Sequence, residues 1–224
     1  MTADPSDLRV HTATAGAFAE NGYVVESVST GRAWIVDPGA CAPQLVATVR
    51  SGDCTLESVL LTHAHIDHVE GLHAVRAAFP DAPILLHDDD LPLYREAAAQ
   101  ASWFGLELDP LPEPGGRLEA GGTLAWGPHE VEIRHAPGHA PGHVVFIAHD
   151  AGLALVGDVI FLGSIGRTDL PGGDFHRLMR SIRDEVLTLP DEMRLLTGHG
   201  PETTVGHERR HNPWLVPQYR GGFA

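Results

Sequence analysis

The apolar positions of this chain fall into short runs separated by glycine, proline and aspartate, a spacing typical of many short strands. Segments 24–28 and 33–36 predict two strands joined by a turn at Thr30-Gly31, and Asp37-Pro38-Gly39 ends the second. Further strands are expected at 58–61, 84–86, 131–133, 144–148, 153–156 and 193–196. The segment 105–122, which holds several prolines and glycines, is expected to be a loop.

Apolar residues three, four and seven positions apart predict helices between these strands. Pro43 is expected to open one short helix, a second is predicted from Leu72, and a third covers 90–101. The longest predicted helix follows Asp174, its candidate N-cap. Its apolar stripe consists of Phe175, Leu178, Met179, Ile182, Val186 and Leu189.

Strands and helices mix in the first part of the chain, and a similar mixture follows in the second. This order predicts an α/β fold in which two mixed sheets pack face to face with helices outside. A length of 224 residues is enough to bury a core, and we expect a single domain over residues 1–224.

Composition narrows the range of partners. Apolar residues make up 43% of the chain, which is ordinary for a soluble globular protein, and the formal net charge is −15. Nucleic acids and anionic membranes both need a positive surface, so neither is an expected partner, and a small-molecule substrate fits better. The chain shows no signal peptide and no membrane-spanning run, and Cys41 and Cys54 form no CxxC pair. We therefore expect a cytoplasmic protein with reduced thiols.

The densest chemistry lies in Thr62-His63-Ala64-His65-Ile66-Asp67-His68, directly after an apolar run. Three histidines and an aspartate this close together indicate a transition-metal site. In an extended segment His63 and His65 point to the same side, Asp67 continues that alternation, and His68 faces elsewhere. One short loop is therefore expected to serve two neighbouring cations.

A single segment rarely completes a metal site, so further ligands are expected downstream. His139, Asp158 and His199 are the candidates, because each follows a predicted strand and is preceded by a glycine. Glycine has no Cβ and lets the backbone approach a crowded site closely.

These motifs resemble those of the metallo-β-lactamase-fold hydrolases, and among them the small type II glyoxalase-like hydrolases. The resemblance rests on segments 36–39, 62–71, 136–143, 157–158, 163–174 and 197–201. It implies a four-layer αβ/βα sandwich. It also implies that one metal is held by His63, His65 and His139, a second by Asp67, His68 and His199, and that Asp158 bridges the two.

The resemblance also implies a reaction. Two divalent cations, with zinc expected first and iron or manganese as alternatives, activate a hydroxide that attacks a small thioester such as S-lactoylglutathione. Asp67 is expected to accept or hand on the proton of that hydroxide. Two alternatives stay open: a persulfide dioxygenase with one iron at His63, His139 and Asp158, and a metal-binding protein without catalysis.

Several residues have weaker assignments. Asp37 and His143 are expected to support the ligands by hydrogen bonds, and Arg167 to contact substrate. The sequence departs from the resemblance at its C-terminal end, where we expect no glutathione-binding helical domain, so we do not assign the thiol carrier. Arg209, Arg210 and His211 are further candidates for contact with an anionic substrate, and Asp88-Asp89-Asp90 is expected to be a solvated helix start.

Overall fold

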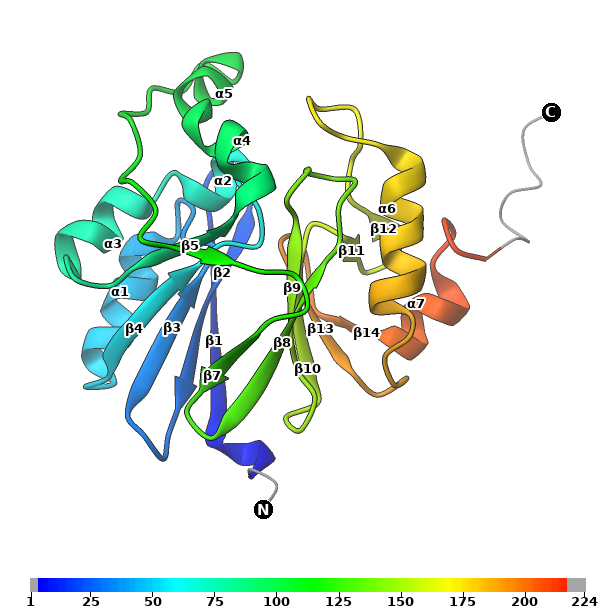
Figure 1. Cartoon of the computed structure of the whole chain (residues 1–224), viewed down its shortest axis with the longest axis horizontal. Helices are drawn as coiled ribbons and strands as arrows, with labels where there is room; N and C mark the ends of the chain where they lie inside the picture. Colours follow the sequence, from blue (N-terminus) through cyan, green and yellow to red (C-terminus); the bar gives the residue numbers. More distant parts are fainter. Residues whose placement is uncertain (1–3, 217–224) are drawn as a thin grey trace.

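Two mixed six-stranded sheets face each other across a buried apolar layer in the computed structural model, which describes residues 4–216 (Figure 1). The first sheet has the order β1-β2-β3-β4-β5-β6. Its strands are β1 Leu8–Ala15, β2 Glu20–Ser27, β3 Arg32–Val36, β4 Thr55–Leu60, β5 Ile84–His87 and β6 Gly116–Leu118. From β1 to β3 the pairing is antiparallel, and from β3 to β6 it is parallel.

The second sheet has the order β14-β13-β10-β9-β8-β7. Its strands are β7 Thr123–Trp126, β8 His129–His135, β9 Val144–Ala148, β10 Leu153–Gly157, β13 Arg194–Thr197 and β14 Thr203–Thr204. All of its pairings are antiparallel except that of β10 with β13. A small hairpin of β11 Ile160–Phe161 and β12 Ser164–Ile165 follows β10.

Helices cover the outer face of each sheet (Figure 1). The first sheet is accompanied by α1 Ala42–Ser51, α2 Ile66–Val69, α3 Leu72–Ala78, α4 Leu91–Arg95 and α5 Ala97–Trp103. The second is accompanied by α6 Phe175–Ser181 and α7 Val205–His211. Short 3₁₀ turns at Pro5–Asp7 and Asp88–Asp90 and a π-helical turn at Ile182–Val186 complete the described elements.

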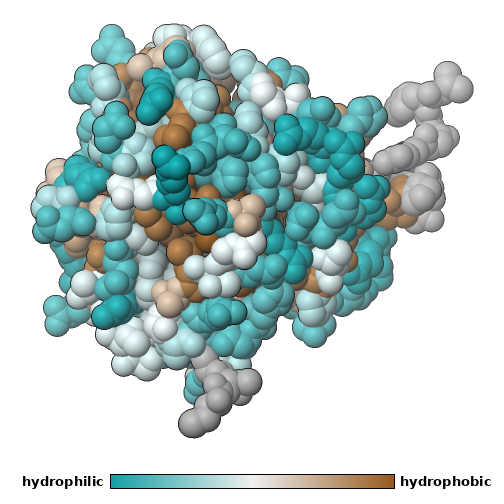
Figure 2. All heavy atoms as spheres, in the orientation of Figure 1, coloured by the Kyte–Doolittle hydropathy of each residue, from teal (hydrophilic) through white to brown (hydrophobic). Residues whose placement is uncertain are grey.

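The alternation of side chains along β2 and β3 explains the layers. Val25 and Trp34 point into the apolar layer between the sheets, where they join Trp126 and Phe146. Val24 and its neighbour Ile35 point to the other side and pack beneath α1 and α3. A third buried cluster lies between the second sheet and α6. Hydrophilic residues accordingly cover most of the face drawn in Figure 2, with apolar residues showing in a limited area near its middle.

The predicted strands and helices are present, with differences at several places. The predicted helix over 90–101 is broken at Glu96 into α4 and α5. The longest predicted helix begins as expected, since Asp174 accepts a hydrogen bond from the N–H of Arg177, but its α-helical part ends at Ser181 and a π-helical turn follows. The strands β1, β6, β7 and β14 and the helix α7 were not predicted. Within residues 4–216, no helix combines the length and the apolar character needed to cross a membrane.

Candidate metal centre

The candidate ligands gather where strands of both sheets end. His63 and His65 follow β4, and His139 lies in the loop after β8. Asp158 directly follows β10, and His199 comes two residues after β13. These residues are far apart in the sequence, but their side chains meet because the two sheets pack face to face. The expectation that ligands recur at strand ends therefore agrees with the fold.

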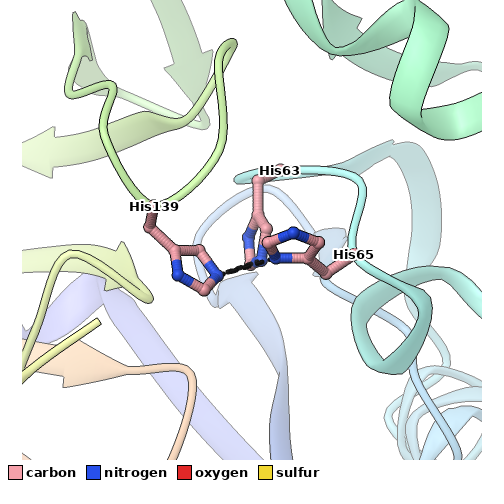
Figure 3. A group of neighbouring side chains, drawn as sticks. All are labelled: His63, His65 and His139. Carbon is pink, nitrogen blue, oxygen red and sulfur yellow. Dashed lines mark hydrogen bonds between the residues drawn. The ribbon is translucent and has the colours of Figure 1, made fainter. Parts of the chain in front are cut away.

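The first group of side chains is His63, His65 and His139, all buried (Figure 3). His139 Nε2 lies 2.7 Å from His65 Nδ1 and 3.2 Å from His63 Nε2. Nitrogens that share one tetrahedral zinc ion at about 2.0–2.1 Å lie about 3.3 Å apart. The spacing of this group therefore suits a transition metal.

The second group is Asp67, His68 and His199. His199 Nε2 lies 3.2 Å from Asp67 Oδ2, and His68 Nε2 lies 4.0 Å from the same oxygen. Here the expected alternation is wrong, because α2 begins at Ile66 and the extended backbone ends at His65. The helical turn places both Asp67 and His68 in the second group.

Asp158 lies between the two groups. Its Oδ2 is 3.4 Å from His139 Nε2 in the first group and 3.4 Å from His199 Nε2 in the second. Its Oδ1 is 3.4 Å from His68 Nε2. One carboxylate thus contacts ring nitrogens of both groups, which is the arrangement that a bridging ligand needs.

In four ligand histidines, the Nδ1 atom contacts an oxygen atom of a neighbouring residue. His139 Nδ1 donates to Arg167 O over 2.8 Å, and His199 Nδ1 donates to Phe18 O over 3.0 Å. His68 Nδ1 lies 3.1 Å from Asp37 Oδ2, and His63 Nδ1 lies 3.1 Å from Thr62 Oγ1. With the proton on Nδ1, the Nε2 atoms of His63 and His139 present lone pairs to the centre, and those of His68 and His199 do so once their Nε2 protons are lost.

With these proton positions, the contacts among the ligands show whether the residues fit a metal ion. The contact between His139 Nε2 and His63 Nε2 then joins two lone pairs with no hydrogen between them. Buried polar atoms normally have a partner, yet His68 Nε2 and Asp158 Oδ1 have none. A cation between these atoms resolves both conflicts, so the residues fit divalent metals.

Asp37 and His143 support the ligands. Asp37 accepts hydrogen bonds from the N–H and hydroxyl of Thr62, over 2.7 and 2.6 Å, besides its contact with His68. Asp37 also lies close enough to His63 and His68 to form a ligand group. However, both of its carboxylate oxygens already contact Thr62 or His68. His143 Nε2 accepts the N–H of Asp158 over 3.0 Å and stacks on His63 at 4.7 Å.

The environment of Asp90 differs from the solvated one that the sequence predicts. The acidic run predicts that it belongs to a solvated helix start, but its side chain is fully buried. Its carboxylate accepts the N–H of Ala64 over 2.9 Å and the N–H of Gly142 over 2.5 Å. Asp90 therefore joins the loop of His63 and His65 to the loop of His139, which the run of three acidic residues did not reveal.

Charges in the centre divide into two kinds. Burial lowers the pKa of His63 and His139, and it lowers the pKa of His65 to about 3, so the first group is neutral and ready to bind a cation. Burial also opposes ionisation of Asp158, but the neighbouring His68 and His199 hold the pKa of its carboxyl well below the usual range. Burial would lower the pKa of His199, but hydrogen bonds to Asp158 and Asp67 raise it to about 10.

A separate group of possible ligands, His87, Asp89 and His135, lies outside the centre. The rings of His87 and His135 are stacked 4.5 Å apart at an interplanar angle of 15°. A metal ion lies in the plane of each imidazole that binds it, and two nearly parallel, stacked planes do not meet at a nearby point. The stack therefore argues against a metal at this place.

A cavity of about 290 Å³ opens onto the ligands. Arg167, the predicted substrate contact, lines the cavity and forms a bidentate ion pair with Asp169 over 2.7 and 2.8 Å. Arg209 and Arg210 do not line the cavity, and both bind Asp191 instead. These two arginines therefore do not form part of the cavity at the metal centre.

The sequence profile of the Metallo-beta-lactamase superfamily matches residues 15–199, a span that contains every candidate ligand. The chain belongs to this superfamily. The predicted fold, with two mixed sheets and helices outside, is confirmed by its solved relatives. Membership, together with the hydrolases among its relatives, supports the coarse chemistry of a metal-dependent hydrolase.

Two bacterial relatives are similar to most of this chain. The hydroxyacylglutathione hydrolase GloC of Haemophilus influenzae is 39% identical over 182 residues, which cover 81% of this chain and 86% of the relative. The probable metallo-hydrolase YqgX of Bacillus subtilis is 37% identical over 201 residues, which cover 89% and 94%.

Two solved structures are similar over nearly the whole chain. TTHA1623, solved in a di-iron-bound form, is 40% identical with a TM-score of 0.83, over 92% of this chain and 100% of that one. The B3 metallo-beta-lactamase BLEG-1 is 34% identical with a TM-score of 0.86, over 93% and 100%. A relative with iron leaves the identity of the divalent metal in this chain open.

Some residues of the centre gave no signal in the sequence. Glu20 is buried, lies 4.0 Å from His68 Nδ1, and has a pKa that burial raises to about 9. Phe18, Gln100 and Phe104 line the cavity from distant parts of the chain. Nothing in their local sequence distinguishes them, because only the packing of the loops brings them together.

Proposed function

We propose that this protein hydrolyses a small acyl thioester at a centre of two divalent metals. In this assignment His63, His65 and His139 would hold one metal, and Asp67, His68 and His199 would hold the second. Asp158 would be the ligand shared by the two. The observation that carries the proposal is the position of Asp158 Oδ2, 3.4 Å from a ring nitrogen of each group.

The residues of the chain prepare the centre for this chemistry. When bound, two divalent cations would lower the pKa of a water molecule and polarise the substrate carbonyl. The hydrogen bonds to Nδ1 of His63, His68, His139 and His199 fix each ring in one tautomer and orientation. Because these supports already exist in the fold, the ligands need little rearrangement.

Asp67 is the candidate proton acceptor. Its carboxylate lines the cavity, and although burial opposes ionisation, His68 and His199 lower the pKa of this carboxyl. An ionised carboxylate at this position can accept the proton of the attacking water. The water oxygen then bonds to the acyl carbon, the carbon–sulfur bond breaks, and the sulfur leaves as a thiol that takes up the proton.

The relatives support this class of reaction. GloC is named a hydroxyacylglutathione hydrolase, and the hydroxyacyl thioester bond is the bond that the proposal assigns to this chain. BLEG-1 is called a metallo-beta-lactamase, so hydrolysis of a β-lactam is the comparison reaction. We expect thioesters to be cleaved faster than nitrocefin.

The proposal is tested by loading the protein with zinc, iron(II) or manganese and measuring metal per chain together with thiol release from S-lactoylglutathione and simpler acyl thioesters. Asp67→Asn should lower turnover about 100-fold or more while the first group still binds metal. Asp81→Asn, at an exposed aspartate, is the matched control and should change neither quantity.

Two results would contradict the proposal. One is a protein with two metals per chain that cleaves none of the thioesters. The other is one iron per chain with oxygen uptake in the presence of a persulfide and no hydrolysis, which would favour the dioxygenase instead. Full turnover by the Asp67→Asn variant would remove the assigned role of Asp67.

A further inference from the structure

The wall of the cavity that faces the metal centre is mainly apolar. Besides the candidate ligands, the residues that line it are Phe18, Ile66, Gln100, Trp103, Phe104, Phe161, Ile165, Arg167 and Leu170. We call these residues the cavity wall. They come from the β1–β2 turn, from α2, from the end of α5 and from the segment around the β11–β12 hairpin. The wall is thus assembled from four separate parts of the chain.

Two aromatic residues of the wall, Trp103 and Phe104, are open to solvent. Trp103 is 56% exposed and Phe104 is 43% exposed, which is unusual for such large apolar side chains. Phe104 meets Phe18 edge to face at 4.9 Å, so the two segments touch across the opening. Phe161, another residue of the wall, packs edge to face on His199 at 5.8 Å. Aromatic rings therefore lie both at exposed positions of the wall and against a candidate ligand.

The polar members of the wall already have partners. The Gln100 side-chain amide donates to Leu93 O over 2.7 Å and to Ala64 O over 3.3 Å. Arg167 is the one cation of the cavity wall, among the residues that the structure describes, and Asp169 pairs with it in bidentate fashion. The wall offers no unpaired positive charge to a carboxylate of a ligand.

We infer that the preferred substrate is an uncharged thioester whose apolar group packs against Trp103 and Phe104, rather than a thioester of an anionic peptide thiol. This inference rests on the proposed function and adds the class of substrate. Glutathione carries two carboxylates, and neither would find an unpaired cationic side chain in the cavity wall to compensate for the water it loses. An apolar group instead gains burial against aromatic faces.

The test measures binding separately from hydrolysis, with matched thioethers that cannot be cleaved. S-benzyl-N-acetylcysteamine is uncharged, and S-benzylglutathione carries the same benzyl group on an anionic thiol. In titration calorimetry with the metal-loaded protein, we expect the uncharged ligand to bind about tenfold more tightly. Replacing benzyl with methyl on either carrier should weaken binding, because the apolar contact is lost.

Variants of the wall assign the effect to particular residues. Trp103→Ala and Phe104→Ala should each weaken binding of S-benzyl-N-acetylcysteamine about tenfold, and because both side chains are exposed, the fold should be kept. Phe175→Ala is the control, since this exposed aromatic residue lies outside the cavity wall. It should leave affinity unchanged.

The pairing of Arg167 gives a second, opposite test. Asp169→Ala would free the guanidinium, and binding of S-benzylglutathione should improve about threefold, as expected for an exposed ion pair. Binding of the uncharged thioether should not change. An Asp169→Ala variant with no gain for the anionic ligand would overturn the argument that Arg167 is neutralised.

Hydrolysis of S-phenylacetyl and S-lactoyl thioesters of both carriers separates this inference from the proposed function. Preference for the uncharged thioether without cleavage of any thioester would keep the preference of the cavity for an uncharged apolar ligand and remove the proposed function. Faster cleavage of S-lactoylglutathione than of the uncharged thioesters would keep the function and overturn the inference. Equal or tighter binding of S-benzylglutathione, or unchanged affinity in Trp103→Ala and Phe104→Ala, would also overturn it.

Discussion

His143 and Asp158 are joined by a hydrogen bond in which the backbone N–H of Asp158 donates to His143 Nε2 over 3.0 Å. The bond joins the loop after β8 to the end of β10 and fixes the position of the Asp158 backbone, from which the carboxylate extends. Gly157 makes this approach possible. A Cβ there would lie 2.8 Å from His143 Nε2 and 2.5 Å from Thr62 Oγ1, and its φ of 47° is in the left-handed region.

Gly157→Ala should therefore destabilise the protein and misplace Asp158. We expect a loss of about 3 kcal/mol or more in the free energy of unfolding, because the positive φ and the crowding act together. Gly152→Ala is the matched control, since its φ is 64° and nothing lies within 4 Å of the added Cβ. It should cost about 1 kcal/mol, from the backbone alone. Urea unfolding of both variants measures the difference, and equal losses would show that crowding at Gly157 is unimportant.

Asp37→Asn should weaken metal binding without changing a ligand. Asp37 accepts hydrogen bonds from Thr62 and supports Nδ1 of His68, and an amide cannot accept at all of these positions. Asparagine keeps the left-handed backbone at this residue, where φ is 48°. We expect metal affinity to fall about 10–100-fold in competition with a chelator. Unchanged affinity would mean that Asp37 acts only as a turn residue.

Metal removal should lower thermal stability. Without a cation, the Nε2 lone pairs of His63 and His139 face each other and the Oδ1 of Asp158 has no partner, all in a buried place. With metal at about a thousandfold excess over its dissociation constant, the melting temperature should rise by about 10 °C relative to the chelated protein. Scanning calorimetry at several zinc concentrations measures it. A melting temperature independent of zinc would contradict metal binding by the folded chain.

Asp90 should make stability depend on pH. Burial raises the pKa of Asp90 to about 6, above the ordinary value of 3.8. Between these values the folded protein keeps the proton that the unfolded chain loses, so the stabilisation is present at low pH and is lost as pH rises through about 6. Asp90→Asn cannot titrate.

The measurement for Asp90 is the difference in unfolding free energy between the wild-type protein and Asp90→Asn from pH 4 to pH 7. We expect the wild-type protein to lose about 2–3 kcal/mol relative to the variant over this range. The other titrating groups are common to both proteins and largely cancel. A constant difference would show that Asp90 is ionised throughout.

Local pattern predicted the sheets and the candidate ligands, because both have strong short-range signals. Apolar runs such as those of β4 and β10 identify buried strands, and the density of histidines at 63–68 is typical of a metal site. The assignment of individual ligands to each metal, and the single-domain boundary over residues 1–224, stay predictions.

Other features depend on packing that no local pattern records. Asp90 looks like part of a solvated acidic run, yet its two acceptors are used by Ala64 and Gly142, which belong to different sheets' loops. The prediction that Asp67 continues the alternation of His63 and His65 is wrong, because nothing in the pattern marks the start of a helix at Ile66. Phe18 and Phe104 are brought together only by loops that meet across the cavity.

The ligands are spread from His63 to His199, and each group closes with its last member in sequence. During synthesis, the first group is incomplete until His139 has left the ribosome, and the second until His199 has left it. Nearly the whole chain must therefore be translated before both metals can be captured.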